Sequence, residues 1–180
     1  LYTSKTSTVF TLHSDFTDIR GFSWANFDDP SINIHIVPRY THIIDIEGAS
    51  YDNLFNSFRS VRKQEIRYAI TRENLKVYRS NNISLLCELY SHVFIRQGVK
   101  PTKSDLTAIK IIYEELQKTQ LNFDIIEVKN KLGKAVASAL VFEDYDKTMH
   151  VPIVGTGDTK YGGSLLYSSI IKWGIEHNVK

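Results

Sequence analysis

The fold of this chain is decided by Gly155-Thr-Gly-Asp-Thr-Lys160-Tyr-Gly-Gly-Ser164-Leu-Leu-Tyr-Ser-Ser-Ile-Ile-Lys-Trp173. An apolar run leads into this stretch and an amphipathic pattern follows its glycines, which predicts a strand, a loop and then a helix. The first N–H groups of a helix have no partner inside the helix, and the helix dipole adds partial positive charge there. The junction therefore predicts a cradle for a phosphate or diphosphate, which Gly162 and Gly163 allow to approach closely. The alternative is that the paired glycines only break a strand before a helix.

Three strand-like runs precede the glycine loop, at residues 123–129, 135–143 and 149–155. The sequence Asn130-Lys-Leu-Gly133 favours a tight hairpin between the first two runs, and Asp144-Tyr-Asp-Lys147 supplies a second polar turn. The pattern predicts three antiparallel strands in meander order, which lead into the loop and a helix from about Gly163 to His177.

The earlier part of the chain predicts three more helices and several short strands. One helix is expected from Ser50 to about residue 70, and two more lie on either side of Gly98 and Pro101, packed as a hairpin. Asn81 or Asn82 caps the second of these helices, and Thr102 forms a capping-box-like pair with Asp105 before the third. Strands are predicted at 8–12, 32–36, 40–47 and 75–78. We expect an α+β fold, α/β mixed, with a central, largely antiparallel sheet flanked by helices.

The composition of the chain limits the kinds of protein that it can be. The chain has 180 residues, of which 42% are hydrophobic and 23% charged, as in a soluble globular domain. A net charge of +2 is too small to indicate a nucleic-acid partner by itself. The lone Cys87 excludes an internal disulfide, and its apolar neighbours favour a packed thiol. The histidines lack metal-ligand spacing, so we expect no metal, and without an apolar run of about 18 residues we expect a cytoplasmic protein.

The meander, the loop at the mouth of its last strand and the helix that opens on that loop resemble the central part of the GNAT acyltransferase fold. The segment Lys160-Tyr-Gly-Gly163-Ser-Leu165 overlaps the pyrophosphate signature of that superfamily, which has Arg or Gln, two residues, Gly, one residue, and then Gly or Ala. Lys160 stands at the basic or polar position and Gly163 fits. Leu165 departs from the pattern, because it occupies a position that is normally small.

A closer resemblance is to the FemAB-like branch of GNAT proteins, which includes acyltransferases of polysaccharide loci. It rests on the order of the pieces from about Trp24 onward, namely Tyr40-Thr-His-Ile-Ile-Asp-Ile, a long basic helix, Phe94-Ile-Arg-Gln-Gly98, the Gly133 hairpin, and Gly155 through Trp173. Two GNAT-like halves are fused in that family. The resemblance therefore implies that residues 1–48 are the tail of a first half, and that 49–180 are a second acyltransferase domain truncated before its last strand.

The resemblance implies an N-acyltransferase that moves an acyl group from acyl-CoA to an amine of an amino sugar or amino acid derivative, in cell-envelope or polysaccharide biosynthesis. An alternative keeps the fold and changes the donor to aminoacyl-tRNA and the acceptor to a peptidoglycan precursor. That alternative requires a larger basic surface than a net charge of +2 provides. A third possibility is a GNAT-like module that binds a partner or glycan without chemistry, and Leu165 favours it.

Candidate donor-binding and catalytic residues lie in and before the glycine loop. The diphosphate of the donor is expected at Gly157, Lys160, Gly162, Gly163 and Ser164. The Tyr161 hydroxyl could protonate the departing thiolate, or its ring could pack on the helix as a lid. His150 could remove the proton of the amine, although a histidine at a strand start also serves as a packing or surface residue.

Candidate substrate-binding residues are cationic and lie before the meander. Arg59, Arg62, Lys63 and Arg67 recur at helical spacing within an arc of about 140 degrees. This stripe could hold an acidic substrate, the phosphates of CoA or a tRNA backbone, or it could be an ordinary solvated face. Arg96 and Gln97 belong to the family-like phrase and are expected to contact substrate, although the helix dipole alone also explains Arg96.

Overall fold

The computed structural model describes residues 18–28, 34–37 and 43–180. The chain divides into two compact units, residues 1–44 and 45–180. In the first unit, α1 spans Arg20–Asp28, and Arg20 forms an ion pair with Asp18 at 2.7 Å. The strand predicted at 8–12 lies outside the described residues. The strands predicted at 32–36 and 40–47 are wrong for the part that is described, because 34–37 and 43–46 are not in strands.

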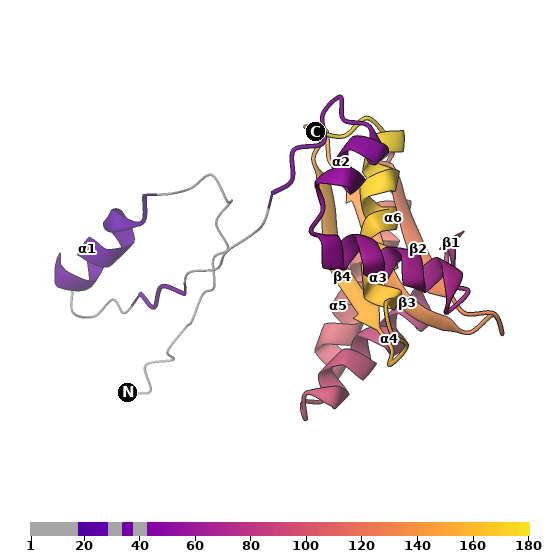
Figure 1. Cartoon of the computed structure of the whole chain (residues 1–180). Helices are drawn as coiled ribbons and strands as arrows, with labels where there is room; N and C mark the ends of the chain where they lie inside the picture. The colour runs from indigo at the N-terminus through magenta and orange to yellow at the C-terminus, as the bar shows by residue number, and fades with distance from the viewer. Residues whose placement is uncertain (1–17, 29–33, 38–42) are drawn as a thin grey trace. The chain divides into compact units, whose positions relative to one another are not determined.

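The second unit has a mixed α+β fold, as expected, with one four-stranded antiparallel sheet in the order β1-β2-β3-β4 (Figure 1). Its elements are α2 (Tyr51–Ser57), α3 (Ser60–Thr71), β1 (Lys76–Ser80), α4 (Ile83–Arg96), α5 (Lys103–Gln117), β2 (Phe123–Lys129), β3 (Ala135–Glu143), β4 (Met149–Thr156) and α6 (Gly162–Glu176). No helix of the described residues is both long and apolar enough to cross a membrane. The assignment of residues 1–48 to the tail of a first GNAT-like half, and of 49–180 to a second, stays a prediction.

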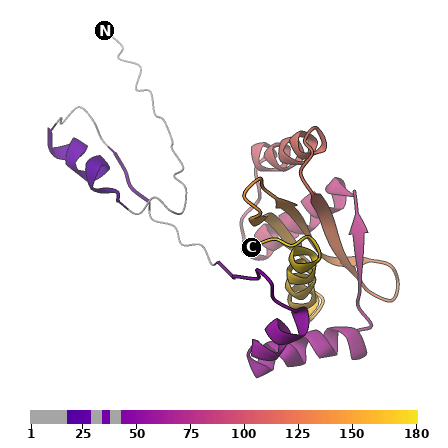
Figure 2. The same cartoon turned by 90° about the horizontal axis from the view of Figure 1, so that it is seen from above.

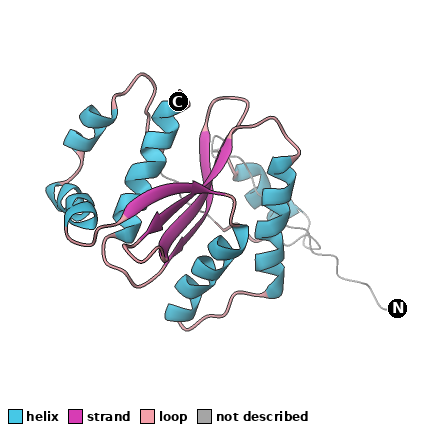
Figure 3. Cartoon of the chain, turned by 90° about the vertical axis from the view of Figure 1, so that its right-hand side faces the viewer, coloured by secondary structure: helices cyan, strands magenta, loops and turns pink. Residues whose placement is uncertain are grey.

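Helices cover both faces of the sheet (Figures 2 and 3). Successive strand residues point to opposite faces, so Leu140 packs with α4 and α5 whereas Val141 packs with α6. The α4 and α5 face is built from Leu86, Cys87, Ile109, Tyr113, Leu116, Ile125, Leu140 and Ile153. The other face includes Ile66, Ala69, Ile126, Val128, Val141, Leu166 and Trp173. Burial raises the pKa of the Cys87 thiol, which fits a packed side chain.

The predicted turns and caps are confirmed by their hydrogen bonds. The Gly133 N–H donates to the Asn130 carbonyl at 2.9 Å, and Gly133 adopts the φ of +78° that glycine tolerates. Asn82 caps α4, and Thr102 and Asp105 form a complete capping box on α5. These local signals place the meander and both helices close to where the sequence predicts them.

The single helix predicted from Ser50 to about residue 70 is wrong, because Phe58 and Arg59 are extended and separate α2 from α3. Ser50 does cap the first piece, through a 3.3 Å bond from the Asn53 N–H to its hydroxyl. The break is stabilised by tertiary contacts. Phe58 packs against the α6 side of the core, and the Lys63 ammonium donates to the Asn56 carbonyl at 3.0 Å.

The main chain of α4 lies directly against β4 at Gly155. A Cβ added to Gly155 would lie 2.4 Å from the main-chain nitrogen of Tyr90 and 2.6 Å from the carbonyl carbon of Leu89. Neither atom can move without moving the helix. Glycine at this position therefore sets the distance between α4 and the strand that leads into the loop.

The substitution Gly155→Ala is expected to lower the free energy of unfolding by about 3 kcal/mol, the upper end of the usual cost of overpacking, because the new methyl group meets main chain. Chemical denaturation followed by far-UV circular dichroism measures the change. The control is Gly163→Ala, whose added Cβ would be 3.8 Å from the nearest atom, a Thr156 methyl group, and which should not destabilise the fold. Equal stabilities for Gly155→Ala and the natural chain would contradict this packing.

Candidate functional site

The N-termini of α6 and α3 have no side-chain cap, unlike those of α2, α4 and α5 in the second unit. Ser50, Asn82 and Thr102 each accept a hydrogen bond from a main-chain N–H at the start of α2, α4 and α5. Tyr161 precedes α6 and makes no such bond. The first amides of α6 are therefore left for another acceptor.

Tyr161 turns the loop into α6 through a left-handed conformation, with φ 63° and ψ −1°. This region costs a bulky residue on the order of 1–3 kcal/mol and recurs at ligand-binding turns. A left-handed residue followed by the right-handed Gly162 makes successive N–H groups converge on one side, which is the geometry of an anion-binding nest. The Tyr161 ring packs against the Tyr68 ring, with 5.9 Å between centroids, which helps to hold this conformation.

The amides of Tyr161, Gly163 and Ser164 donate to no acceptor within the described part of the chain, and the first N–H after them to do so is that of Leu165, which donates to Tyr161. All three residues line a pocket of about 400 Å³ together with Arg62, Glu65 and Tyr167. The pocket brings unpaired main-chain donors and a guanidinium group to one place. Its chemistry suits a phosphate-bearing ligand.

A small charged network borders these amides. Arg62 Nη1 lies 2.5 Å from Glu65 Oε2 and donates to Ser164 Oγ at 3.0 Å, and the Ser164 hydroxyl donates to Glu65 at 2.6 Å. The Glu65 carboxylate thus supplies negative charge at the positive end of α6. An anion in this pocket would compete with Glu65 for Arg62.

The loop glycines have different roles. Gly157 donates its N–H to the Val136 carbonyl at 2.8 Å, and its own carbonyl accepts from Arg96, so its main chain is already used within the protein. Gly162 is buried, and a Cβ there would be 3.3 Å from a Val136 methyl group, which indicates close packing of α6 on β3. Gly163 is the glycine that lines the pocket. Lys160 is exposed, and no contact of its ammonium group is found among the described residues.

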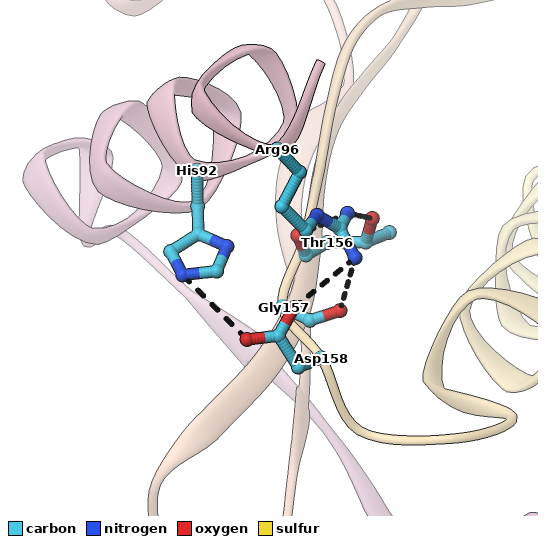
Figure 4. A network of polar contacts seen from close by, with 5 residues as sticks. All are labelled: His92, Arg96, Thr156, Gly157 and Asp158. Carbon is cyan, nitrogen blue, oxygen red and sulfur yellow. Dashed lines mark hydrogen bonds and ion pairs between the residues drawn. The ribbon is translucent and has the colours of Figure 1, made fainter. Parts of the chain in front are cut away.

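Arg96 reaches from the end of α4 to the end of β4 and the start of the loop (Figure 4). Its Nη2 donates to the Thr156 carbonyl and hydroxyl, both at 3.0 Å, and its Nη1 donates to the Gly157 carbonyl at 3.2 Å. Nη1 also lies 3.4 Å from Asp158 Oδ1, while His92 Nε2 lies 3.8 Å from the other Asp158 oxygen. These contacts assign Arg96 a structural role in fixing the loop. Gln97 is exposed at the end of α4, and its predicted substrate contact stays untested.

The predicted cationic stripe separates in the structure. Only Arg62 reaches the pocket. Lys63 binds the Asn56 carbonyl, Arg67 lies over the Phe55 ring at 5.8 Å, and Arg59 is exposed at the start of α3. The break between α2 and α3 therefore directs two of the four cations toward α2, away from the loop.

His150 is not brought together with the loop. It lies at the start of β4, six residues before the strand ends, and six residues of strand span about 20 Å. Its Nε2 lies 2.7 Å from Asp144 Oδ2, and its ring stacks on Phe142. Burial would raise the pKa of Asp144, but hydrogen bonds from His150 and from the Thr148 and Asp146 amides outweigh it and hold that pKa below its ordinary value. The pair stabilises the β3–β4 turn.

Sequence reasoning missed Glu65, Tyr167 and Tyr68, which lie in or beside the pocket. Glu65 follows Arg62 by three residues, a helical spacing that places the two side chains together. The tyrosines carry no comparable signal. Leu165, which departs from the family signature, is buried in the core on the α6 side and is not among the pocket residues. Within the described residues no group of three or more His, Cys, Asp or Glu side chains could hold a metal ion.

Comparisons with known proteins relate this chain to others through its fold. No known protein family and no curated protein sequence matches the chain. Among solved structures it is similar to a crystal structure of FemX, with a TM-score of 0.60 and 14% sequence identity. The match covers 71% of this chain and 48% of the FemX chain, so this chain matches about half the length of that protein. The chain therefore has a FemX-like fold, consistent with the GNAT-like architecture expected from the sequence.

Loss of the Arg96 contacts is expected to loosen the loop. In Arg96→Met, hydrogen exchange at the Gly157 amide, which donates to the Val136 carbonyl, should accelerate by about tenfold, because removal of several hydrogen bonds from one guanidinium group costs about 1–3 kcal/mol. The matched variant Arg96→Lys keeps the charge at the end of α4 but cannot bridge two carbonyl groups. Hydrogen exchange in Arg96→Lys should therefore be nearly as fast as in Arg96→Met. If the amide of Arg96→Lys exchanges at the rate of the natural chain, the positive charge at the end of α4 accounts for the protection, and the hydrogen bonds from Arg96 to the loop carbonyls do not.

Proposed function

We propose that this chain is part of a Fem-type transferase that moves an acyl or aminoacyl group from a phosphate-bearing donor to an amine. The observation that carries the proposal is the uncapped α6 N-terminus, where the unpaired amides of Tyr161, Gly163 and Ser164 open on a pocket with Arg62. The FemX-like fold supports it. In this proposal residues 1–48 belong to a first GNAT-like half and 49–180 to the second.

The pocket would bind the phosphate groups of the donor. Main-chain amides and a guanidinium group are hydrogen-bond donors that match phosphate oxygens, and neither group has to lose a proton when the ligand binds. Lys160 would add an exposed cation beside the loop. The amine would then attack the carbonyl carbon of the donor, and the thiol or the tRNA hydroxyl would leave. Tyr161, the predicted proton donor, lines the pocket, whereas the position of His150 supports a structural role better than a catalytic one.

Two donors are compatible with this site. The likeness to FemX favours aminoacyl-tRNA with a peptidoglycan precursor as the acceptor, the chemistry implied by the Fem-type resemblance. The partial pyrophosphate signature from Lys160 to Leu165 favours acyl-CoA with an amino sugar or amino acid derivative. The non-catalytic alternative loses its main support, because the Leu165 side chain lies in the core.

The variant Gly163→Asp tests the donor site. A carboxylate at this position repels a phosphate, and repulsion of about 1.4 kcal/mol weakens binding about tenfold. The matched control Gly163→Asn has nearly the same shape and no charge, and should change the affinity less than threefold. The chain would be titrated by calorimetry with CoA, acetyl-CoA and a tRNA pool, and the ligand that binds identifies the donor.

The variant Glu65→Gln should act in the opposite direction in the same titration, because it removes the negative charge beside Arg62. Thermal unfolding of each variant checks that the fold is retained. Unchanged affinity in Gly163→Asp for the ligand that binds the natural chain would rule out this loop as the donor site.

A further inference from the structure

An exposed aromatic side chain lies on the wall of the pocket at the N-terminus of α6. Tyr167 lines this pocket and is 54% exposed, whereas Leu166, Ile170 and Trp173 of the same helix are at most 2% exposed. Within the described part of the chain, the Tyr167 ring contacts no other ring and its hydroxyl makes no hydrogen bond. The fold therefore leaves this ring available to a ligand in the pocket.

Tyr167 lies one helical turn after Gly163, so the two residues share one face of α6. A long side chain on a helix is directed toward the N-terminus and covers the turn before its own Cα. The turn that Tyr167 covers begins at Gly163, which has no side chain, and a Cβ added there would be 3.8 Å from the nearest atom, a Thr156 methyl group. The space beside Gly163 is therefore open, and the aromatic ring and the unpaired amides border it together.

The pocket thus combines two kinds of recognition. The Gly163 and Ser164 amides and the Arg62 guanidinium are hydrogen-bond donors for phosphate oxygens, and Tyr167 adds a flat aromatic face. A nucleotide has both matching parts, because a planar base is linked to its phosphates through a sugar. Aromatic side chains bind bases by stacking, and loss of such a ring weakens binding by about fivefold or more. A volume of about 400 Å³ is within the size range of small-molecule sites.

We infer that this pocket binds a nucleotide, with its phosphates at Arg62 and at the Gly163 and Ser164 amides, and with its base stacked on Tyr167. The inference rests on the proposed phosphate site, and it assigns the part of the donor that lies next to the phosphates. CoA and tRNA share this chemistry, because the diphosphate of CoA is linked to adenosine and tRNA ends in adenosine. Tyr167 is then a specificity residue for the nucleoside of the donor, whatever acyl group the donor has.

Calorimetry with ADP and with pyrophosphate separates the base from the phosphates. ADP should bind about fivefold tighter than pyrophosphate or better. In Tyr167→Leu the affinity for ADP should fall by about fivefold or more, while that for pyrophosphate should change by less than about twofold. The variant Tyr167→Phe keeps the ring and should bind ADP like the natural chain. The control Tyr145→Leu alters a tyrosine that is 84% exposed in the β3–β4 turn, and should change neither affinity.

Proton NMR of ADP supplies a readout that a general change in the fold would not imitate. The adenine protons should shift upfield on binding to the natural chain and to Tyr167→Phe, because they lie over an aromatic ring, and should not shift in this way with Tyr167→Leu. CoA and the dinucleotide cytidylyl-adenosine, which is the end of tRNA, form two further arms. The one whose affinity depends on Tyr167 in the same way as that of ADP identifies the source of the nucleotide.

The outcomes distinguish this inference from the proposed donor site. If Gly163→Asp weakens the binding of ADP and pyrophosphate while Tyr167→Leu leaves both unchanged, the inference is overturned and the phosphate site stands. If ADP binds as expected but neither CoA nor cytidylyl-adenosine binds, the nucleotide pocket stands and the proposed donor is wrong. If neither ADP nor pyrophosphate binds, or if ADP binding is unchanged by Gly163→Asp, both are overturned.

Discussion

The contact between the main chain of α4 and β4 at Gly155 is the constraint on which the candidate site depends. With no side chain at Gly155, α4 lies close enough to the strand for Arg96, at the end of that helix, to reach the Thr156 and Gly157 carbonyls. These hydrogen bonds from Arg96 fix the point at which the chain leaves the sheet. Tyr161 then turns the loop into α6, and Tyr161, Gly163 and Ser164 line the pocket. Packing on one face of the sheet thus sets the position of unpaired donors at the end of β4.

The electrostatics of the site rest on main-chain dipoles more than on net charge. A helix N-terminus contributes about 0.3–1 kcal/mol to the binding of an anion, and up to about 2 kcal/mol when partly buried. Arg62 adds a full positive charge, which Glu65 balances. Main-chain donors would allow a chain with a net charge of only +2 to bind an anion locally, as proposed. In the proposed site Glu65 would lower the affinity for an anion, because the ligand would have to compete with the Glu65 carboxylate for Arg62.

Local signals predicted the elements well and the side-chain contacts poorly. The turn at Gly133, the caps at Ser50, Asn82 and Thr102, and the three strand-like runs of the meander depend on neighbours in the sequence, and all are confirmed. The break at Phe58 and Arg59 arises from packing between distant segments, which a helical periodicity cannot indicate. The same limit applies to the site. The glycine loop was visible in the sequence, but the partners of Arg96, the pairing of Glu65 with Ser164, and the distance of His150 from the loop all depend on tertiary structure.

The central claim is that the amides of Tyr161, Gly163 and Ser164 bind the phosphate groups of the donor. Proton–nitrogen NMR of the chain during titration with CoA, and separately with a tRNA acceptor-stem fragment, tests it most directly. The account predicts downfield shifts of these three amide protons that saturate with the ligand that binds, and no such shifts with pantetheine, which lacks the diphosphate. Saturable binding of CoA or the acceptor stem that moves amides elsewhere and leaves these three unchanged would contradict it.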